Sequence, residues 1–295
     1  MPHVRVVHTP LYRYVQPVRF LPHRLMLRPH DSHDLWVRGA VLGLTPAAAV
    51  TRWAHDVFGN SVCLVEWTDT RSDSLEIVST LDIDHYPATS ELPRETLDPL
   101  AETYPFGYAA DEMPDLGRLI ERQYMDPERK LDTWARRFLR RGTPLRTLNL
   151  LAAITQAIRE DFVYEARAAE GTNPPLVTLE QRKGACRDFA VLMMEAARAL
   201  GFAARFVSGY LYDEALVDGA QGVVGGGATH AWCQVYLPGA GWVEFDPTNG
   251  LIAGRNLLRV SVARAAEQAV PVAGGYLGRR EDFLAMDVDV AVETG

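Results

Sequence analysis

Residues 180–190 read EQRKGACRDFA and place a lone cysteine, Cys186, after two small residues and at the start of a helical pattern. Apolar side chains follow at positions 189, 192, 193, 196, 197 and 200, the spacing of a helix with one buried face, and Gly201 supplies a stop. A cysteine in the first turn of a helix lies beside unpaired backbone N–H groups and the positive end of the helix dipole, which favour the thiolate. Cys186 is therefore a candidate nucleophile, and a small buried apolar residue is the alternative interpretation.

Two further helices are predicted before this one. Thr143 has the chemistry of an N-cap and Pro144 suits the first helical position, so a helix is expected from there to about Asp161. Residues 178–181, TLEQ, have the pattern of a capping box that opens a short helical turn. Gly184 is then placed to end that turn in a left-handed conformation.

A base and an orienting group for a thiol nucleophile are expected in the hairpin formed by residues 229–237, THAWCQVYL, and 241–246, GWVEFD. Alternation along the first strand puts His230 and Trp232 on one face. If Tyr236 lies opposite Trp242, the backbones of Asp246 and His230 are about 7–8 Å apart on a diagonal, within side-chain reach. A slip of one residue would put the two side chains on opposite faces.

The three cysteines, Cys63, Cys186 and Cys233, are far apart in sequence and odd in number, which argues against a disulfide framework. Cys63 lies in an apolar β run and Cys233 faces away from His230, so both are interpreted as core packing. No Cys-x-x-Cys or His-x-x-x-His spacing occurs, and the glycine run 225–227 lacks the Lys-Ser/Thr of a phosphate loop. Neither a metal nor a cofactor is therefore predicted.

The composition bounds the location and the partners. The chain has 295 residues and a formal net charge of −8, and its Lys and Arg residues are scattered, which argues against nucleic acid as a partner. Its N-terminal stretch has no apolar run of signal-peptide length, and nowhere does an uncharged apolar run reach about 18–20 residues, so we expect no membrane segment and a cytoplasmic location. The oligomeric state cannot be inferred from these features.

The order of the predicted elements gives an α+β fold class with three parts. Residues 1–90 contain short alternating or β-branched runs and are predicted to form an antiparallel β domain. Residues 91–142 are a proline-bearing linker followed by one or two exposed helices. Residues 143–295 are expected to form a core of helices packed on an antiparallel sheet, with a C-terminal β tail.

Three blocks together resemble the transglutaminase-like superfamily and, within it, a bacterial cysteine protease group with a β-rich N-terminal domain. The blocks are GACRDFA at 184–190, RALGFAARFVSGY at 198–210 and THAWCQVYLPGAGWVEFDPTNG at 229–250. The front of the chain is also similar to the N-terminal domain of this group, in YRYVQPV, HRLMLRP and DVFGN. The resemblance therefore covers nearly the whole chain.

The resemblance implies a papain-like Cys-His-Asp triad on an α+β core, with Cys186 as nucleophile, His230 as general base and acid, and Asp246 as the residue that orients the imidazole. The expected reaction is acyl transfer through a thioester on a peptide or protein substrate. The Cys186 backbone N–H and one side-chain donor, for which Tyr164 and Trp232 are candidates, would hold the oxyanion. Water would then give hydrolysis of peptide or isopeptide bonds, and an amine would give transamidation; a peptide-binding scaffold without catalysis is the third hypothesis.

Three features depart from the resemblance. Arg187 stands where related sequences often have glutamine, and residues 263–266, ARAA, replace a common Gly-Arg-Asp-Tyr. The glycine-rich insert 213–229 before His230 is either a mobile lid over the site or a tolerated surface loop.

Overall fold

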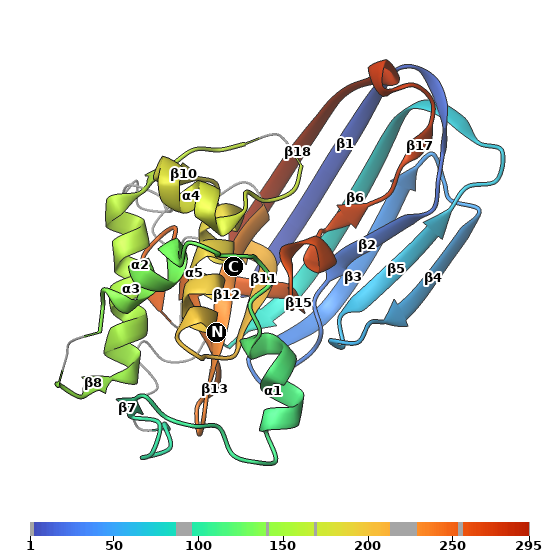
Figure 1. Cartoon of the computed structure of the whole chain (residues 1–295). Helices are drawn as coiled ribbons and strands as arrows, with labels where there is room; N and C mark the ends of the chain where they lie inside the picture. Colours follow the sequence, from blue (N-terminus) through green and yellow to red (C-terminus); the bar gives the residue numbers. More distant parts are fainter. Residues whose placement is uncertain are drawn as a thin grey trace.

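The structure is a computed structural model, and it describes residues 3–86, 96–139, 142–167, 170–212, 229–252 and 256–294. Within these residues two packed antiparallel sheets form one part of the molecule, and five helices accompany a further five-stranded sheet in the other (Figure 1). The predicted α+β class, with a helix-covered antiparallel sheet behind an N-terminal β domain, is confirmed.

The N-terminal β domain is a sandwich of two sheets. Its strands are β1 (His3–Phe20), β2 (His23–Arg28), β3 (Leu35–Thr45), β4 (Val50–His55), β5 (Ser61–Glu66), β6 (Arg71–His85), β16 (Val272–Ala273), β17 (Tyr276–Leu277) and β18 (Phe283–Thr294). One sheet has the order β17-β1-β6-β3 with β18 also paired to β1, and the other has the order β16-β2-β5-β4. Leu25, Cys63 and Ile77 belong to the apolar core between them.

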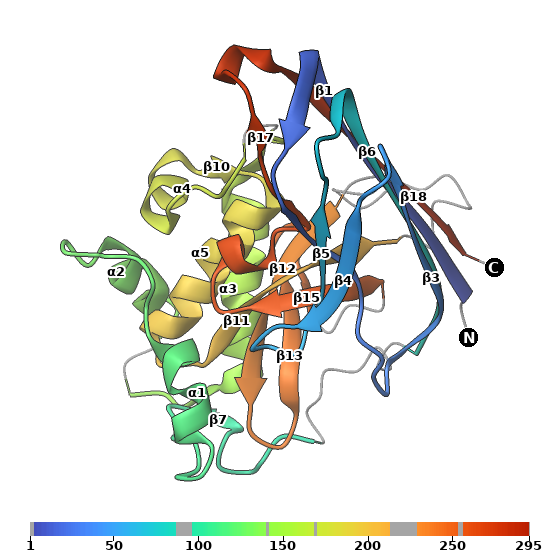
Figure 2. The ribbon, with the colours of Figure 1, turned by 90° about the vertical axis from the view of Figure 1, so that its right-hand side faces the viewer.

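Three of these strands come from the far end of the described chain. β18 runs antiparallel to β1 from Val4 opposite Thr294 to Tyr14 opposite Phe283, so the two ends of the chain lie side by side (Figure 2). The sequence-based division assigned residues 272–294 to the core as a β tail. The strand pairing instead returns these residues to the N-terminal β domain.

The core sheet has the order β14-β13-β12-β11-β15, and every neighbouring pair in it is antiparallel. Its strands are β11 (Ala204–Leu211), β12 (Thr229–Leu237), β13 (Gly241–Asp246), β14 (Leu251–Ile252) and β15 (Leu257–Ala263). The helices are α1 (Met113–Ile120), α2 (Lys130–Arg136), α3 (Thr147–Asp161), α4 (Pro175–Gln181) and α5 (Cys186–Ala199), with short 3-10 turns η2 (Ala266–Ala269) and η3 (Arg280–Asp282). Two small pairs complete the fold: β7 (Thr103–Tyr104) with β8 (Leu145–Arg146), and β9 (Val163–Tyr164) with β10 (Lys183–Gly184).

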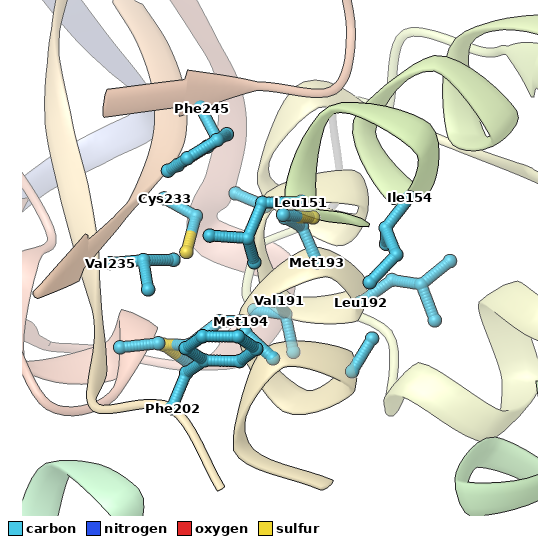
Figure 3. Close-up of a cluster of buried hydrophobic side chains, with 14 of the residues drawn as sticks. Leu151, Ile154, Val191, Leu192, Met193, Met194, Phe202, Cys233, Val235 and Phe245 are labelled. Atoms are coloured by element: carbon cyan, nitrogen blue, oxygen red, sulfur yellow. The ribbon is translucent and has the colours of Figure 1, made fainter. Parts of the chain in front are cut away.

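Helix α5 is the centre of the core. All of its residues from Asp188 to Arg198 are buried, because one side packs on β11 and β12 and the other on α2, α3 and α4. Figure 3 shows Val191 to Met194 of α5 in one apolar cluster with Leu151 of α3 and Cys233 of β12. Each such fully buried side chain contributes roughly 1.5–3 kcal/mol of transfer free energy, so this helix, which begins at Cys186, is firmly held.

Two predicted helix starts are wrong, and one helix stop is right. The helix expected from Thr143 begins at Thr147, because Leu145 and Arg146 are extended and pair with β7. α4 begins at Pro175, so residues 178–181 lie inside it. The left-handed residue at its end is Arg182, with φ 54°, and not Gly184. The stop at Gly201 is confirmed by its φ of 89°.

The N-terminal β domain packs on the core sheet at two places. Apolar side chains of β1, β6 and β18 meet Tyr210 at the end of β11 and Leu258 of β15. In addition, the loop between β4 and β5 docks on β15, where the Asn60 side chain donates to the Val262 carbonyl at 2.7 Å and accepts from the Val262 amide at 2.9 Å. Phe58 of the same loop packs beside the apolar cluster that contains Trp232.

Candidate active site

Cys186 is the first residue of α5, as its sequence pattern predicts, and it is half-buried. Ala185 precedes it as the N-cap in an extended conformation. Glycine is needed at position 184, because a Cβ there would lie 2.9 Å from the Cβ of Asp188. Among the described residues no backbone acceptor pairs with the Cys186 amide, so this N–H at the positive end of the helix is available to a ligand.

The hairpin has the predicted register. Tyr236 lies opposite Trp242 and Cys233 lies opposite Phe245, so Asp246 ends β13 on the diagonal from His230. The His230 Nε2 atom and the Asp246 Oδ2 atom are 2.9 Å apart, and both side chains are completely buried. The expected pairing of these two side chains is therefore confirmed.

The turn after Asp246 holds its carboxylate, a role that the sequence reasoning missed. The Thr248 amide donates to Oδ1 at 2.9 Å, and the Asn249 side chain donates to Oδ2 at 2.8 Å. Arg159 of α3 donates to the Thr248 carbonyl at 2.9 Å and ties the turn to the helix. The available signal was the stretch Asp-Pro-Thr-Asn, because aspartate and asparagine side chains commonly bond to nearby backbone in turns.

Cys186 and Asp246 act on the charge of His230 from two sides. Burial lowers the pKa of His230, but the Asp246 carboxylate and then Cys186, through hydrogen bonding and charge, raise this pKa to about 10. Burial also opposes ionisation of Asp246, yet the attraction of His230 and three hydrogen bonds keep the pKa of Asp246 below its usual range. The arrangement therefore favours the charged imidazolium form of His230.

The two oxyanion candidates have different neighbours: Tyr164 lies near Cys186, and Trp232 lies against His230. Tyr164 of β9 is half-buried, and burial raises its pKa, to which the neighbouring Cys186 adds. Its phenol therefore stays protonated at neutral pH and can donate a hydrogen bond near the thiol. Trp232 is fully buried and stacks on His230, with ring centroids 6.0 Å apart and an interplanar angle of 26°, in a cluster with Val207 and Leu257. Its position is that of a packing residue for the imidazole.

The other two cysteines are confirmed as core residues. Cys63 lies inside the N-terminal sandwich and Cys233 lies between the core sheet and α5, and neither side chain is exposed. Burial raises the pKa of the Cys233 thiol to about 12, so it stays protonated. Of the cysteines, Cys186 is the one with an accessible, polar setting.

Within the described ranges, no group of three or more His, Cys, Asp or Glu side chains could hold a metal ion. None of the helices in those ranges has both the length and the apolar character needed to cross a bilayer. The insert proposed as a lid, residues 213–229, lies outside the described residues except for Thr229.

Two family models match the chain. Residues 132–247 match the transglutaminase-like superfamily, and residues 4–84 match the bacterial transglutaminase-like N-terminal region. A crystal structure of a "putative cysteine protease" from Cytophaga hutchinsonii has the same fold, with a TM-score of 0.70 and 20% sequence identity, covering 100% of this chain and 91% of that one.

Three curated relatives show how the likeness is distributed. An uncharacterized protein of Mycobacterium tuberculosis is 28% identical over 303 residues, 98% of this chain and 91% of its own length. An uncharacterized protein of Mycobacterium leprae is 37% identical over 118 residues, 40% of this chain and 39% of that protein. A protein-glutamine gamma-glutamyltransferase of Pseudomonas aeruginosa is 32% identical over 133 residues, which are 43% of this chain and 19% of the transferase.

Proposed function

We propose that this chain, which contains a transglutaminase-like superfamily domain behind a bacterial transglutaminase-like N-terminal region, is a cysteine hydrolase that cleaves peptide or isopeptide bonds. The observation that carries the proposal is the buried His230–Asp246 pair next to a half-buried cysteine at a helix N-terminus. Members of this superfamily are typically cysteine-dependent enzymes, and the neighbour from Cytophaga hutchinsonii carries a protease name.

The reaction begins with attack of the Cys186 thiolate on an amide carbonyl carbon. A C–S bond forms, and the carbonyl electron pair moves to oxygen to give an oxyanion. The Cys186 amide is our candidate for one donor to this oxyanion, and the Tyr164 hydroxyl is our candidate for the second. Cys186 lies in the first turn of α5, and Tyr164 is held near it because β9 pairs with β10 just before the helix.

Collapse of this intermediate breaks the C–N bond, and the His230 imidazolium gives its proton to the departing amine. The product is a thioester on Cys186 with a neutral imidazole. His230 then takes a proton from water as the water attacks, and the thiolate leaves with the acid product released. Asp246 holds the ring through Nε2, so Nδ1 is the nitrogen left to exchange protons at Cys186.

The transferase named in Pseudomonas aeruginosa favours a second candidate, in which an amine replaces water as the acyl acceptor. Both candidates share every step up to the thioester. Mass analysis of products from a glutamine-containing peptide, with and without a primary amine, separates them: free acid in both samples supports hydrolysis, and an amine adduct supports transamidation.

The proposed function is tested by the pH dependence of Cys186 alkylation with iodoacetamide, using a Cys63→Ala, Cys233→Ala background. Because the imidazolium stabilises the thiolate, we expect alkylation to be near its maximal rate well below pH 7. In His230→Ala the midpoint should move toward the value of an ordinary thiol, about 8.5. Equal midpoints near that value in both proteins would contradict the proposal and favour a non-catalytic scaffold.

A further inference from the structure

Asp188 is a completely buried carboxylate two residues after Cys186, and the mechanism above gives it no part. It accepts three hydrogen bonds. The donors are the Ala185 amide at 2.9 Å, the Asn173 amide at 2.7 Å and the Arg167 guanidinium at 2.9 Å. A buried carboxylate with three donors, one of them charged, is a strong local anchor.

Arg167 extends this anchor along the chain. Besides Asp188, its guanidinium donates to the Asn173 side-chain oxygen at 2.9 Å and to the Gly171 carbonyl at 2.8 Å. The Arg187 side chain in turn donates to the Arg167 carbonyl at 3.0 Å. Arg167, Gly171 and Asn173 are thus bound to the first turn of α5 and to each other.

Arg167 follows closely after β9, the strand that carries Tyr164. β9 pairs in parallel with β10, with Tyr164 next to Gly184, and the Glu165 amide donates to the Gly184 carbonyl at 2.9 Å. Gly184 leaves the space that the Asp188 side chain needs to fold back over the helix start. The residues of the Gly-Ala-Cys-Arg-Asp stretch therefore depend on one another. Gly184 leaves room for the Asp188 side chain, and Asp188 binds the Ala185 amide directly before Cys186.

We propose that Asp188 is a positioning residue for the proposed reaction, because its bonds to Ala185, Asn173 and Arg167 set the place of Cys186 relative to His230 and Tyr164. The inference rests on the proposed function, since it concerns the same thiol. Without the Asp188 charge, Arg167, whose side chain is 28% exposed, would lose its ion-pair partner and could turn toward solvent, and the segment that carries it would move. The first turn of α5 would shift with it.

The test is the pH midpoint of Cys186 alkylation by iodoacetamide in Asp188→Asn, in the background lacking the other two cysteines. Cys186 is faced by His230 and Tyr164, and Arg187 acts on Tyr164; none of these three residues is changed by the substitution. If Asp188 acted through its charge alone, the midpoint would fall, because a negative charge near the thiolate is gone. A positioning role predicts the opposite: a rise of about one pH unit, which is a ten-fold lower alkylation rate below the midpoint.

Glu195→Gln is the matched control. Glu195 lies in the same helix, is equally buried, and likewise binds an arginine, Arg198, at 2.8 Å together with the amides of Gln123 and Tyr124. This variant should lose stability and keep the wild-type midpoint. If Asp188→Asn does not fold, Arg167→Lys keeps the positive charge and the two amide bonds to Asp188 but loses the forked contacts to Asn173 and Gly171, and it should also raise the midpoint.

An unchanged or lowered midpoint in folded Asp188→Asn, or an unchanged midpoint in Arg167→Lys, overturns the positioning role. A shift of the same size in Glu195→Gln also overturns it, because loosening of the helix in general would then explain the effect. These results differ from failure of the proposed function, in which wild type and His230→Ala would already titrate alike.

Discussion

His230 has different neighbours at its two ring nitrogens, and this division defines what the residue can do. An ionised carboxylate accepts hydrogen bonds and cannot donate them, so Asp246 requires a proton on Nε2. When the ring is neutral, the free electron pair is therefore on Nδ1, the buried nitrogen that has no other partner among the described side chains. The hydrogen bond to Asp246 and the stacking on Trp232 hold the ring in this orientation.

Asp246→Asn should lower both the rate and the alkaline limit of activity. The wild-type pKa of His230 is raised to about 10, so the charged ring should persist until the pH passes that value. Without the carboxylate we expect the alkaline limb of the pH profile to fall by about 1–3 pH units. An amide can also donate to Nε2 and favour the wrong tautomer, so a loss of about 10³–10⁴ in kcat is expected.

The matched control is Asp161→Asn, the same exchange at an exposed carboxylate that pairs with Arg137 at 2.8 Å on the surface. Its pH profile should coincide with that of the wild type. If the alkaline limb of Asp246→Asn stays near pH 10, the pKa of His230 does not depend on Asp246 and the proposed role of the carboxylate is wrong.

At the level of elements, the pairing of β11 with β12 creates the space that Trp232 occupies. Gly209 lies directly opposite His230, and a Cβ at Gly209 would overlap the Leu258 carbonyl and lie 2.7 Å from the Trp232 ring. We expect Gly209→Ala to cost roughly 1–3 kcal/mol of unfolding free energy, because a packed core resists added volume. The displaced ring should also lower the rate of Cys186 alkylation at pH 6.

Gly43→Ala supplies the comparison for this prediction. Gly43 is also a strand glycine, but its nearest atoms, in Val78, would lie 3.8 Å from an added Cβ. Denaturant unfolding should show little change for Gly43→Ala and a clear loss for Gly209→Ala. Equal stabilities of the two variants would mean that the sheet absorbs the methyl group without moving Trp232.

The sequence predicted those elements whose signal is local. The start of α5 at Cys186, the stop at Gly201 and the register of the β12–β13 hairpin follow from spacing within about twenty residues. The start of α3 was missed because pairing of β8 with β7, some forty residues earlier, keeps Leu145 extended despite a good cap at Thr143. The role of Gly184 was missed because glycine is needed there to make room for the Asp188 side chain, and not to form a left-handed turn.

For the whole molecule, the last strand of the described chain completes the first sheet. Val290 of β18 lies opposite His8 of β1 and is buried with Val4 and Val6 against the core sheet. Alternating apolar residues at 283–294 predicted a strand, but not which sheet would receive it, because pairing partners far apart in sequence leave no local trace. Pairing with β1 makes the N-terminal β domain depend on residues that follow the core.

Two buried histidines join the N-terminal β domain to the core sheet. His8 of β1 is hydrogen-bonded to the Tyr210 hydroxyl at 3.0 Å, and His85 of β6 is hydrogen-bonded to the Tyr212 hydroxyl at 2.8 Å. Burial lowers the pKa of each histidine to about 4, and at His85 the opposing charges of Asp34 and Arg259 act in addition. Tyr210 lies in β11 next to Gly209, which faces His230, and Tyr212 directly follows this strand, so the junction also supports the candidate site.

The junction should make the protein acid-sensitive below neutral pH. Because the folded pKa of each histidine lies below its unfolded value of 6.5, the unfolded state binds more protons, and stability falls as the pH drops from 6.5 through 4. The loss is of order 3 kcal/mol per histidine, and it should be complete near pH 4.

In thermal unfolding measured from pH 7.5 to 4, His8→Gln/His85→Gln should start from a lower Tm and show a flatter pH slope than wild type. His30→Gln, a change at an exposed histidine, should keep the wild-type slope. If the double variant keeps that slope as well, other groups cause the acid sensitivity and the junction histidines do not.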